Sequence, residues 1–538
     1  MLPQLERMHD AARRREPGTA RGEHAHERVL TPSPKALPMK ADLSSRALVR
    51  NTGWNVIGYA APAMVAVICI PPLLRALGIE RFGILTLAWV LIGYLGLFDL
   101  GIGRALTKLI AERRATSTQT ELASLAQTAL VALLGLGFVG SLAGLALSGL
   151  LAREVLAIPA PLQAEAAKSL AILFLALPLV VSSAALAGLL EAFQRFDLVN
   201  AVRVPLGIAS FVFPLGATAL SPDLVTVALS LVLVRLAGWA GYSWLANRLL
   251  RIADRWRFEP AQVRALLRLG GWMTVSSVAG PLMVYLDRFV LGARTTISAV
   301  AYYATPFELI TKLLVVPSAV GGVLFPGFAS LHSADPSGFR RLGRIGTALI
   351  LAALFPVALV LVLFPGALLT MWLDAEFAQH SRRVVQWLAL GTFLNAAAHV
   401  PFAALQAAGR PDLTAKLHLA ELPLYLGGLA LGVSLMGIDG AAIAWTMRVT
   451  IDTVLLYALA RAVLGRRGSP GRTVYAIVGG CALALVLCML TEDPRIRLMA
   501  LVVLLALFGI SAWRFLLSPR DRAVIASGLR TLSSPRPS

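Results

Sequence analysis

The stretch LEAFQRFDL (190–198) returns 215 residues later as LQAAGRPDL (405–413), with an arginine and an aspartate at the same positions in both copies. Two further matches support a repeat: TGWNVIGYAAPAMV (52–65) with GGWMTVSSVAGPLMV (270–284), and Arg235 with Arg448. The offsets lie between 213 and 219 residues. Because the offset is nearly constant at separated places, the chain contains two copies of one unit.

Around these motifs the chain is too apolar for a soluble protein. It has 538 residues, of which 57% are hydrophobic and 14% charged, and its mean hydropathy is +0.74. A soluble domain carries about 25% charged residues. Apolar runs of about 20 residues, long enough to cross a bilayer, occur about fourteen times. The sequence therefore predicts an all-α polytopic membrane protein with about 14 transmembrane helices.

The predicted spans divide into two lobes and an addition. Six spans fall in an N-lobe (50–250) and six in a C-lobe (269–465). An even number of spans per copy leaves both copies in the same orientation, so we expect a parallel repeat about an axis along the membrane normal. The remaining segments are expected to be a disordered basic arm (1–49), a cytoplasmic linker (251–268), two extra C-terminal helices (473–517) and a cytoplasmic tail (518–538).

The formal net charge of +20 is compatible with nucleic-acid binding, but the distribution of the charge favours another explanation. We number each connection by the predicted span that precedes it. The even-numbered connections contain more than twice as many Lys and Arg residues as the odd-numbered ones. Cytoplasmic loops carry such an excess. We therefore expect the lipid bilayer as the partner, no nucleic acid, and both termini in the cytoplasm.

Motifs for several kinds of chemistry are missing from the sequence. It has no Walker A motif, no HExxH motif and no Cys/His cluster, and its three cysteines lie in apolar runs. The connections on the outer side are short, whereas a membrane glycosyltransferase or polymerase would carry a sizeable outer loop with catalytic groups. We therefore expect no cofactor, no metal and no catalytic residue, and an enzyme is the less favoured alternative.

Ionisable residues inside predicted spans are the candidate functional residues, because a charge near the bilayer centre costs roughly 2.5–3.5 kcal/mol on insertion scales. The bases are assigned to a cationic central cavity, since the planar fork of Arg binds phosphate oxygens bidentately. They are Arg235, Arg288, Lys312 and Arg448. The acids are assigned to ion coupling or ion pairing. They are Asp99, Asp287, Glu308 and Asp452. Structural ion pairs between the lobes are the alternative for these residues.

Helical spacing predicts which of these groups pair with one another. Residues four apart share a helix face, which predicts the pairs Glu308–Lys312 and Arg448–Asp452. Asp287 and Arg288 are adjacent, so on a helix they point about 100° apart and are expected not to pair closely. His418 and Glu421, three residues apart, are close enough to share a proton.

The opening of the chain contains Asn51 and the motifs LGIERFGIL (77–85) and LFDLGIGRAL (97–106). With these residues it resembles bacterial polysaccharide-export flippases of the Wzx or O-antigen-translocase type. In the second copy, YLDRFVLGARTTISAVAYYATPFELI (285–310) resembles the Asp-containing seventh span of that family and the Tyr-rich start of the eighth. The resemblance covers about residues 46–465. The superfamily also holds the MATE multidrug exporters and the lipid II flippases.

The resemblance implies a MATE-like two-lobed fold and a function. It implies that the chain flips undecaprenyl-diphosphate-linked oligosaccharide across the bacterial inner membrane by alternating access, driven by an ion gradient or by glycan flux. The lipid-linked glycan would be the substrate, and a polysaccharide polymerase and chain-length proteins would be further partners. A cation-coupled drug exporter and a lipid II flippase are the alternatives. The bases inside the spans favour an anionic cargo, whereas fourteen spans are a feature of the lipid II branch.

Overall fold

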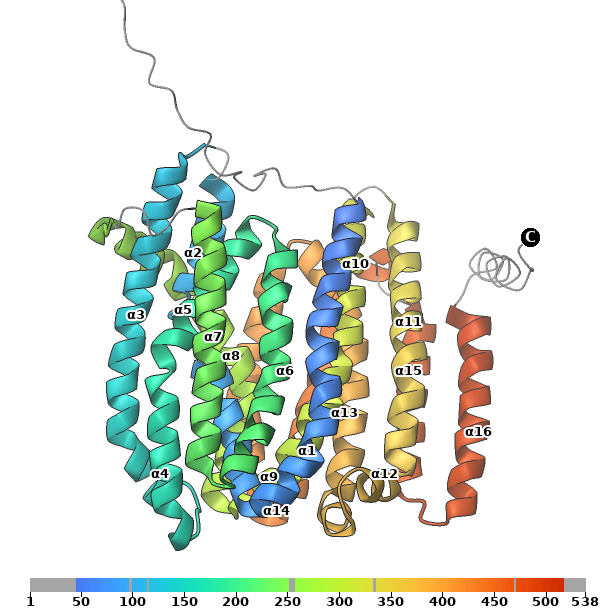
Figure 1. The fold of residues 1–538 in the computed structure, drawn as a ribbon. Helices are drawn as coiled ribbons and strands as arrows, with labels where there is room; N and C mark the ends of the chain where they lie inside the picture. The colour runs from blue at the N-terminus through green and yellow to red at the C-terminus, as the bar shows by residue number, and fades with distance from the viewer. Residues whose placement is uncertain are drawn as a thin grey trace, which may run out of the picture. The chain divides into compact units, whose positions relative to one another are not determined.

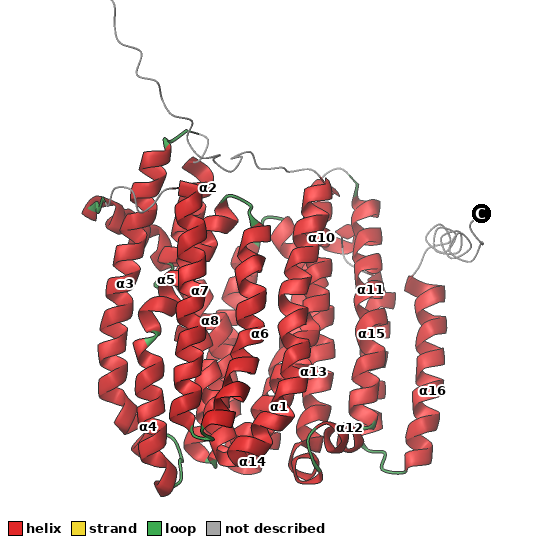
Figure 2. Cartoon of the chain, in the orientation of Figure 1, coloured by secondary structure: helices red, strands yellow, loops and turns green. Residues whose placement is uncertain are grey.

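The computed structural model describes residues 45–95, 99–113, 116–250, 257–331, 335–468 and 471–516. Within these ranges the chain is helical with connecting loops and no strand (Figure 2), which confirms the predicted all-α fold. The predicted tail lies outside the described residues. So does the predicted arm, except for its last five residues, which begin the first helix at Ser45.

The helices are described in two halves of the chain, taken at the bounds of the predicted N-lobe and C-lobe (Figure 1). The first half contains α1 (Ser45–Leu95), α2 (Ile102–Arg113), α3 (Gln119–Leu150), η1 (Leu151–Val155), α4 (Ala160–Leu175), α5 (Leu177–Ala192), α6 (Phe196–Leu220) and α7 (Leu224–Leu250). The second half contains α8 (Pro260–Arg294), α9 (Ile297–Thr311), η2 (Lys312–Leu314), α10 (Val315–Leu331), α11 (Pro336–Leu363), α12 (Pro365–Trp372), α13 (Ala375–Ala407) and α14 (Pro411–Gly468). After them come α15 (Gly471–Met489), α16 (Pro494–Ser511) and η3 (Ala512–Leu516), which pack beside α11.

The long helix α14 reverses direction at Gly437. A straight helix of its 58 residues would be about 87 Å long, far more than the roughly 30 Å of a bilayer core. Gly437 has a φ of 57°, and a Cβ added to Gly432 would lie 2.7 Å from the carbonyl oxygen of Gly440. Residues on either side of Gly437 therefore lie side by side. This reversal falls where the sequence predicts the break between two spans, at MGID (436–439).

The predicted number of spans is not confirmed. In the part of the chain that the structure describes, ten helical segments are long and apolar enough to cross a membrane. One of them, Pro411–Gly465, counts once although Gly437 breaks it, and Thr473–Met489 is shorter than the other ten. The predicted linker also differs, because α8 already begins at Pro260 and takes up the second part of 251–268.

The repeated motif makes the same ion pair in both halves. Arg195 donates from Nε and Nη2 to the two carboxylate oxygens of Asp197, at 2.9 and 2.7 Å. Arg410 donates in the same way to Asp412, at 3.0 and 3.2 Å. This agreement supports the predicted repeat. The match of 52–65 with 270–284 falls largely on side chains outside the described part of the chain.

The residue before each of these arginines has a left-handed backbone conformation. Gln194 has a φ of 58° and Gly409 a φ of 75°, and this conformation costs an ordinary L-residue about 1 kcal/mol. We expect Gln194→Gly to raise the free energy of unfolding by about 1 kcal/mol and Gly409→Gln to lower it by a similar amount. Thermal unfolding of the purified protein in detergent measures both. Identical melting temperatures for the wild type and both variants would contradict the argument.

Two close contacts join the halves at the end of the helices that holds the η1–α4 and α8–α9 connections. A Cβ on Gly83 of α1 would collide with the carbonyl oxygen of Ile297 at the start of α9. The backbone N–H of Ala157 donates to the carbonyl of Gly292 at 2.7 Å. The two halves therefore touch at this end, which we name the closed end.

Trp372 adds a third bond at the closed end, to a carbonyl that a proline leaves free. In a helix the carbonyl of Val67 would accept the N–H of residue 71, but Pro71 has no N–H. The Nε1 of Trp372 donates to this carbonyl instead, at 2.7 Å. The bond links α12 of the second half to α1 of the first half.

Replacing Trp372 by Phe keeps an aromatic ring and removes the donor. Leaving this part-buried carbonyl unpaired costs up to about 1–3 kcal/mol, so we expect the closed end to open more often. The connections of the closed end lie on the predicted outer side of the membrane. A cysteine placed in the cavity, as Ser210→Cys, should then react about fivefold faster or more with an impermeant maleimide added to whole cells. The three native cysteines are buried. The exposed Trp513→Phe is the matched control, and equal labelling rates in all three proteins would contradict the role of Trp372.

Candidate functional site

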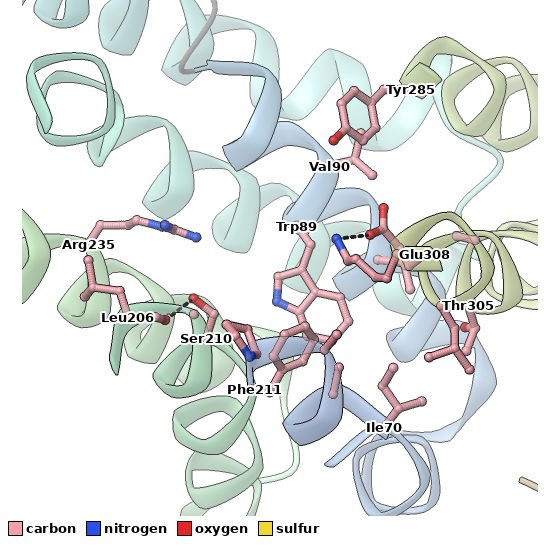
Figure 3. Close-up of a pocket in the computed structure, with 18 of the residues that line it drawn as sticks. Ile70, Trp89, Val90, Leu206, Ser210, Phe211, Arg235, Tyr285, Thr305 and Glu308 are labelled. Atoms are coloured by element: carbon pink, nitrogen blue, oxygen red, sulfur yellow. Dashed lines mark hydrogen bonds and ion pairs between the residues drawn. The ribbon is translucent and has the colours of Figure 1, made fainter. Parts of the chain in front are cut away.

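A cavity of about 440 Å³ lies between the two halves, lined by α1, α5, α6 and α7 on one side and by α8, α9 and η2 on the other. Its charged lining residues are four bases and one acid, namely Arg203, Arg235, Arg288, Lys312 and Glu308. Its aromatic lining residues are Phe82, Trp89, Phe211, Tyr242 and Tyr285. Figure 3 labels Trp89, Phe211 and Tyr285 among them. The cavity thus combines an apolar wall with an excess of cationic groups, three of which were predicted.

Asp287 and Arg288 are held by a buried network, and both side chains have 0% exposure. Arg288 donates from Nη2 to Glu308 at 2.8 Å, and its guanidinium lies 4.4 Å from the ring centre of Phe307. The hydroxyl of Tyr303 donates to Asp287 at 2.5 Å. The prediction that Asp287 and Arg288 do not pair closely is wrong. The carboxylate folds back onto the backbone N–H of Arg288 at 2.7 Å, which also brings it within 3.5 Å of Nη1.

The predicted pair Glu308–Lys312 is confirmed. The Nζ of Lys312 lies 3.3 Å from Oε2 of Glu308, while Arg288 binds the other carboxylate oxygen. One carboxylate therefore serves two bases, and Asp287 supplies a second negative charge beside them. Within this network the charges of the two bases are balanced by those of two acids.

The other two bases of the cavity differ in their partners. Arg203, which sequence reasoning missed because it lies near the start of a span, donates to Glu191 at 2.8 Å. Arg235, midway along α7, has a buried Nε with no hydrogen-bond partner. Among the described residues, it is the one base of the cavity lining that has no carboxylate partner. Any anion in the cavity would therefore find its uncompensated positive charge on Arg235.

The predicted pair Arg448–Asp452 is wrong, and neither residue lines the cavity. Arg448 lies 3.6 Å from Glu421, and His418 lies 3.3 Å from Asp452. The reason is the reversal of α14 at Gly437, which sets residues 418 and 421 of one arm opposite residues 452 and 448 of the other. We name His418, Glu421, Arg448 and Asp452 the α14 cluster.

The α14 cluster is buried but loosely bonded. Glu421 and Asp452 are buried, and Arg448 is nearly so. The contacts of 3.6 and 3.3 Å are long for charged groups, and neither carboxylate oxygen of Glu421 has a hydrogen-bond partner. These carboxyl groups therefore keep free acceptor positions inside the second half.

Asp99 caps a helix. Its two carboxylate oxygens accept the backbone N–H groups of Gly101 and Gly103, at 2.8 and 3.1 Å, at the start of α2. It does not belong to the cavity lining. This geometry is that of a structural helix cap.

No group of three or more His, Cys, Asp or Glu side chains among the residues that the structure describes is arranged to hold a metal ion.

Two groups of known sequences resemble this chain. Residues 48–332 match a family described as polysaccharide biosynthesis protein. A putative O-antigen transporter of Shigella flexneri is 30% identical over 410 residues, which cover 76% of this chain and 97% of that protein. The lipopolysaccharide biosynthesis protein WzxC of Escherichia coli (strain K12) is 24% identical over 433 residues, which cover 78% of this chain and 82% of that protein.

Solved structures of MATE transporters share the fold. An inward-facing multidrug resistance MATE family transporter of the MOP superfamily superposes with a TM-score of 0.65 at 13% identity, covering 78% of this chain and 98% of its own. The MATE multidrug transporter DinF-BH has a TM-score of 0.59 at 17% identity, with coverages of 78% and 97%. At this level of identity the likeness concerns the fold alone.

Proposed function

Because this chain belongs to the polysaccharide biosynthesis protein family, we propose that it is a flippase for undecaprenyl-diphosphate-linked oligosaccharide in the bacterial inner membrane. In this proposal it is a transporter rather than an enzyme, it works by alternating access, and both of its termini are cytoplasmic. The name of the Shigella relative as an O-antigen transporter supports the choice of cargo. A polysaccharide polymerase and chain-length proteins are the proposed protein partners.

Arg235 is the observation that carries this proposal. It lines the cavity between the halves without a carboxylate partner among the described residues, so the cavity has one uncompensated positive charge. A guanidinium binds phosphate oxygens in a bidentate way. A diphosphate entering the cavity would thus remove the cost of burying an unpaired cation.

The same charge argues against the drug-exporter alternative. A cavity for small cations would present acids, whereas here the charged lining is four bases and one acid. A lipid II flippase is the second candidate, since lipid II carries the same diphosphate and α15 and α16 follow the two repeated halves.

The α14 cluster is the proposed site of ion coupling. Asp287 and Glu308, predicted for this role, are tied to Arg288, Lys312 and Tyr303. Glu421, by contrast, has two buried oxygens without hydrogen-bond partners, and its carboxyl can take up a proton without breaking a short bond.

Glu421→Gln tests this coupling. The variant keeps the shape of the side chain and removes its titration, so we expect transport to lose its stimulation by a pH gradient while the rate without a gradient persists. The measurement is transport in proteoliposomes with and without the gradient, and the exposed Glu492→Gln is the control. Undiminished stimulation in Glu421→Gln would remove the α14 cluster from the mechanism.

A clean deletion strain tests the function itself. If the proposal is correct, lipid extracts should accumulate diphosphate-linked oligosaccharide while surface polysaccharide falls, and the wild-type gene should reverse both. Sensitivity to cationic dyes without accumulation would point to a drug exporter instead. A gene that cannot be deleted would favour lipid II as the cargo.

A further inference from the structure

Among the described residues that line the cavity, the buried polar atoms without a hydrogen-bond partner include Nε1 of Trp89, Oγ1 of Thr305 and Nε of Arg235. Buried polar groups are nearly always bonded, and each exception calls for a physical reason. Two other hydroxyl groups of the lining are satisfied within their own helices. Thr86 donates to the carbonyl of Gly83 at 2.7 Å and Ser210 to that of Leu206 at 2.8 Å. The lack of a partner at Trp89, Thr305 and Arg235 is therefore not a general feature of the polar groups that line the cavity.

Trp89 is held in place by other aromatic rings. Its ring centre lies 5.1 Å from that of Phe211 in a tilted arrangement and 6.2 Å from that of Phe82, edge to face. In the view of Figure 3, Trp89 lies between Arg235 on one side and Glu308 and Thr305 on the other. The indole is thus a fixed apolar surface with one free N–H donor.

We propose that Trp89 and Thr305 form a sugar subsite, which holds a sugar unit next to the diphosphate while Arg235 binds the phosphate groups. This inference rests on the proposed function. A sugar ring has an apolar face of C–H groups and a rim of hydroxyls. The C–H face suits the electron-rich face of an indole. The rim suits a donor-only indole N–H and a threonine hydroxyl that both donates and accepts.

The two residues of the subsite come from different halves. Trp89 lies on α1 and Thr305 on α9, and these helices pack against each other across the boundary between the halves. A sugar that bonds to both residues is held only while the halves keep this arrangement. When the halves move apart, one of the two bonds is lost, so the bound sugar favours one state over the other.

The test is a comparison of two lipids on one sample of the purified full chain in nanodiscs. The probes are undecaprenyl diphosphate and the same lipid bearing one N-acetylhexosamine. We expect the wild type to bind the sugar-bearing lipid about tenfold more tightly, since each hydrogen bond contributes up to about that factor. Trp89→Leu and Thr305→Val should each lose most of this preference and keep their affinity for the bare lipid. Trp89→Phe, which keeps a ring and removes the donor, should lose part of the preference.

Because the readout is a ratio within one sample, a loss of folded protein affects both lipids equally. Thr305→Val should fold at least as well as the wild type, since it removes an unbonded buried hydroxyl. The exposed Trp244→Leu is the control. If Trp89→Leu and Thr305→Val keep the full preference of the wild type, the subsite is refuted while the flippase proposal stands. If the wild type binds neither lipid, both proposals fail.

Discussion

Arg235→Gln is expected to reduce transport about 10- to 100-fold and to leave the protein at least as stable as the wild type. A hydrogen bond to a charged group contributes about 1.5–3 kcal/mol, and each 1.4 kcal/mol is a factor of about ten in rate. The guanidinium of Arg235 has no carboxylate partner among the described residues. Its removal therefore breaks no ion pair there and relieves the desolvation of an uncompensated charge.

The expected loss of transport and the expected stability of Arg235→Gln are both measurable. Complementation of the deletion strain gives the amount of surface polysaccharide, and thermal unfolding of the purified variant gives its stability. Arg153→Gln, on an exposed position of η1, is the matched control and should complement fully. Full complementation by Arg235→Gln would mean that the cargo does not use this charge, and a large fall in melting temperature would mean that Arg235 has a structural partner.

Arg288→Met, unlike Arg235→Gln, should act mainly on stability. We expect it to lower the free energy of unfolding by about 3–5 kcal/mol. The side chain is fully buried, and it bonds to Glu308 at 2.8 Å and approaches Asp287 at 3.5 Å. Its loss leaves the carboxylate of Asp287 buried without a cation, whereas Glu308 retains Lys312. We expect a low yield and a lowered melting temperature, with lost transport as a consequence of lost folded protein.

A second substitution separates this explanation from a direct role in cargo binding. Asp287→Asn added to Arg288→Met removes the orphaned charge and keeps a hydrogen-bond partner for Tyr303. The double variant should recover much of the lost stability, which a double-mutant cycle quantifies. A wild-type melting temperature for Arg288→Met alone would contradict the network described for this site.

Local spacing in the sequence was enough to predict those features that depend on neighbours along one helix or loop. The pair Glu308–Lys312 follows from a separation of four residues, and the reversal of α14 follows from a Gly between two apolar runs. The two Arg–Asp pairs follow from the repeated motif. Each of these features needs only the local backbone.

Features that depend on the register between helices were not predictable. Arg448 and Asp452 share a helix face. The two arms of α14 pack against each other, however, so that Arg448 contacts Glu421 and Asp452 contacts His418 on the opposite arm. Arg235 occupies the position in the repeat that matches Arg448, and it alone of the two lines the cavity. Equivalent positions in the two copies have different neighbours, because the cavity between the copies is lined by different positions in each copy.

Trp89 was missed although the sequence contains a signal for it. Trp in membrane proteins concentrates at the interfaces with water, and a Trp well inside an apolar run is therefore unusual. The structure adds that Nε1 of Trp89 is buried without a hydrogen-bond partner, which the apolar pattern of the sequence does not reveal.

Direct translocation by the purified protein tests the central claim, that the cavity around Arg235 moves a diphosphate-linked sugar across the membrane. Liposomes containing the protein would carry a fluorescent undecaprenyl-diphosphate sugar, and an impermeant reductant added outside would quench whatever reaches the outer leaflet. We expect complete quenching with the wild type and, over the same period, quenching of little more than the outer half with Arg235→Gln and with protein-free liposomes. Equal quenching in wild-type and protein-free liposomes, with the protein folded, would contradict it.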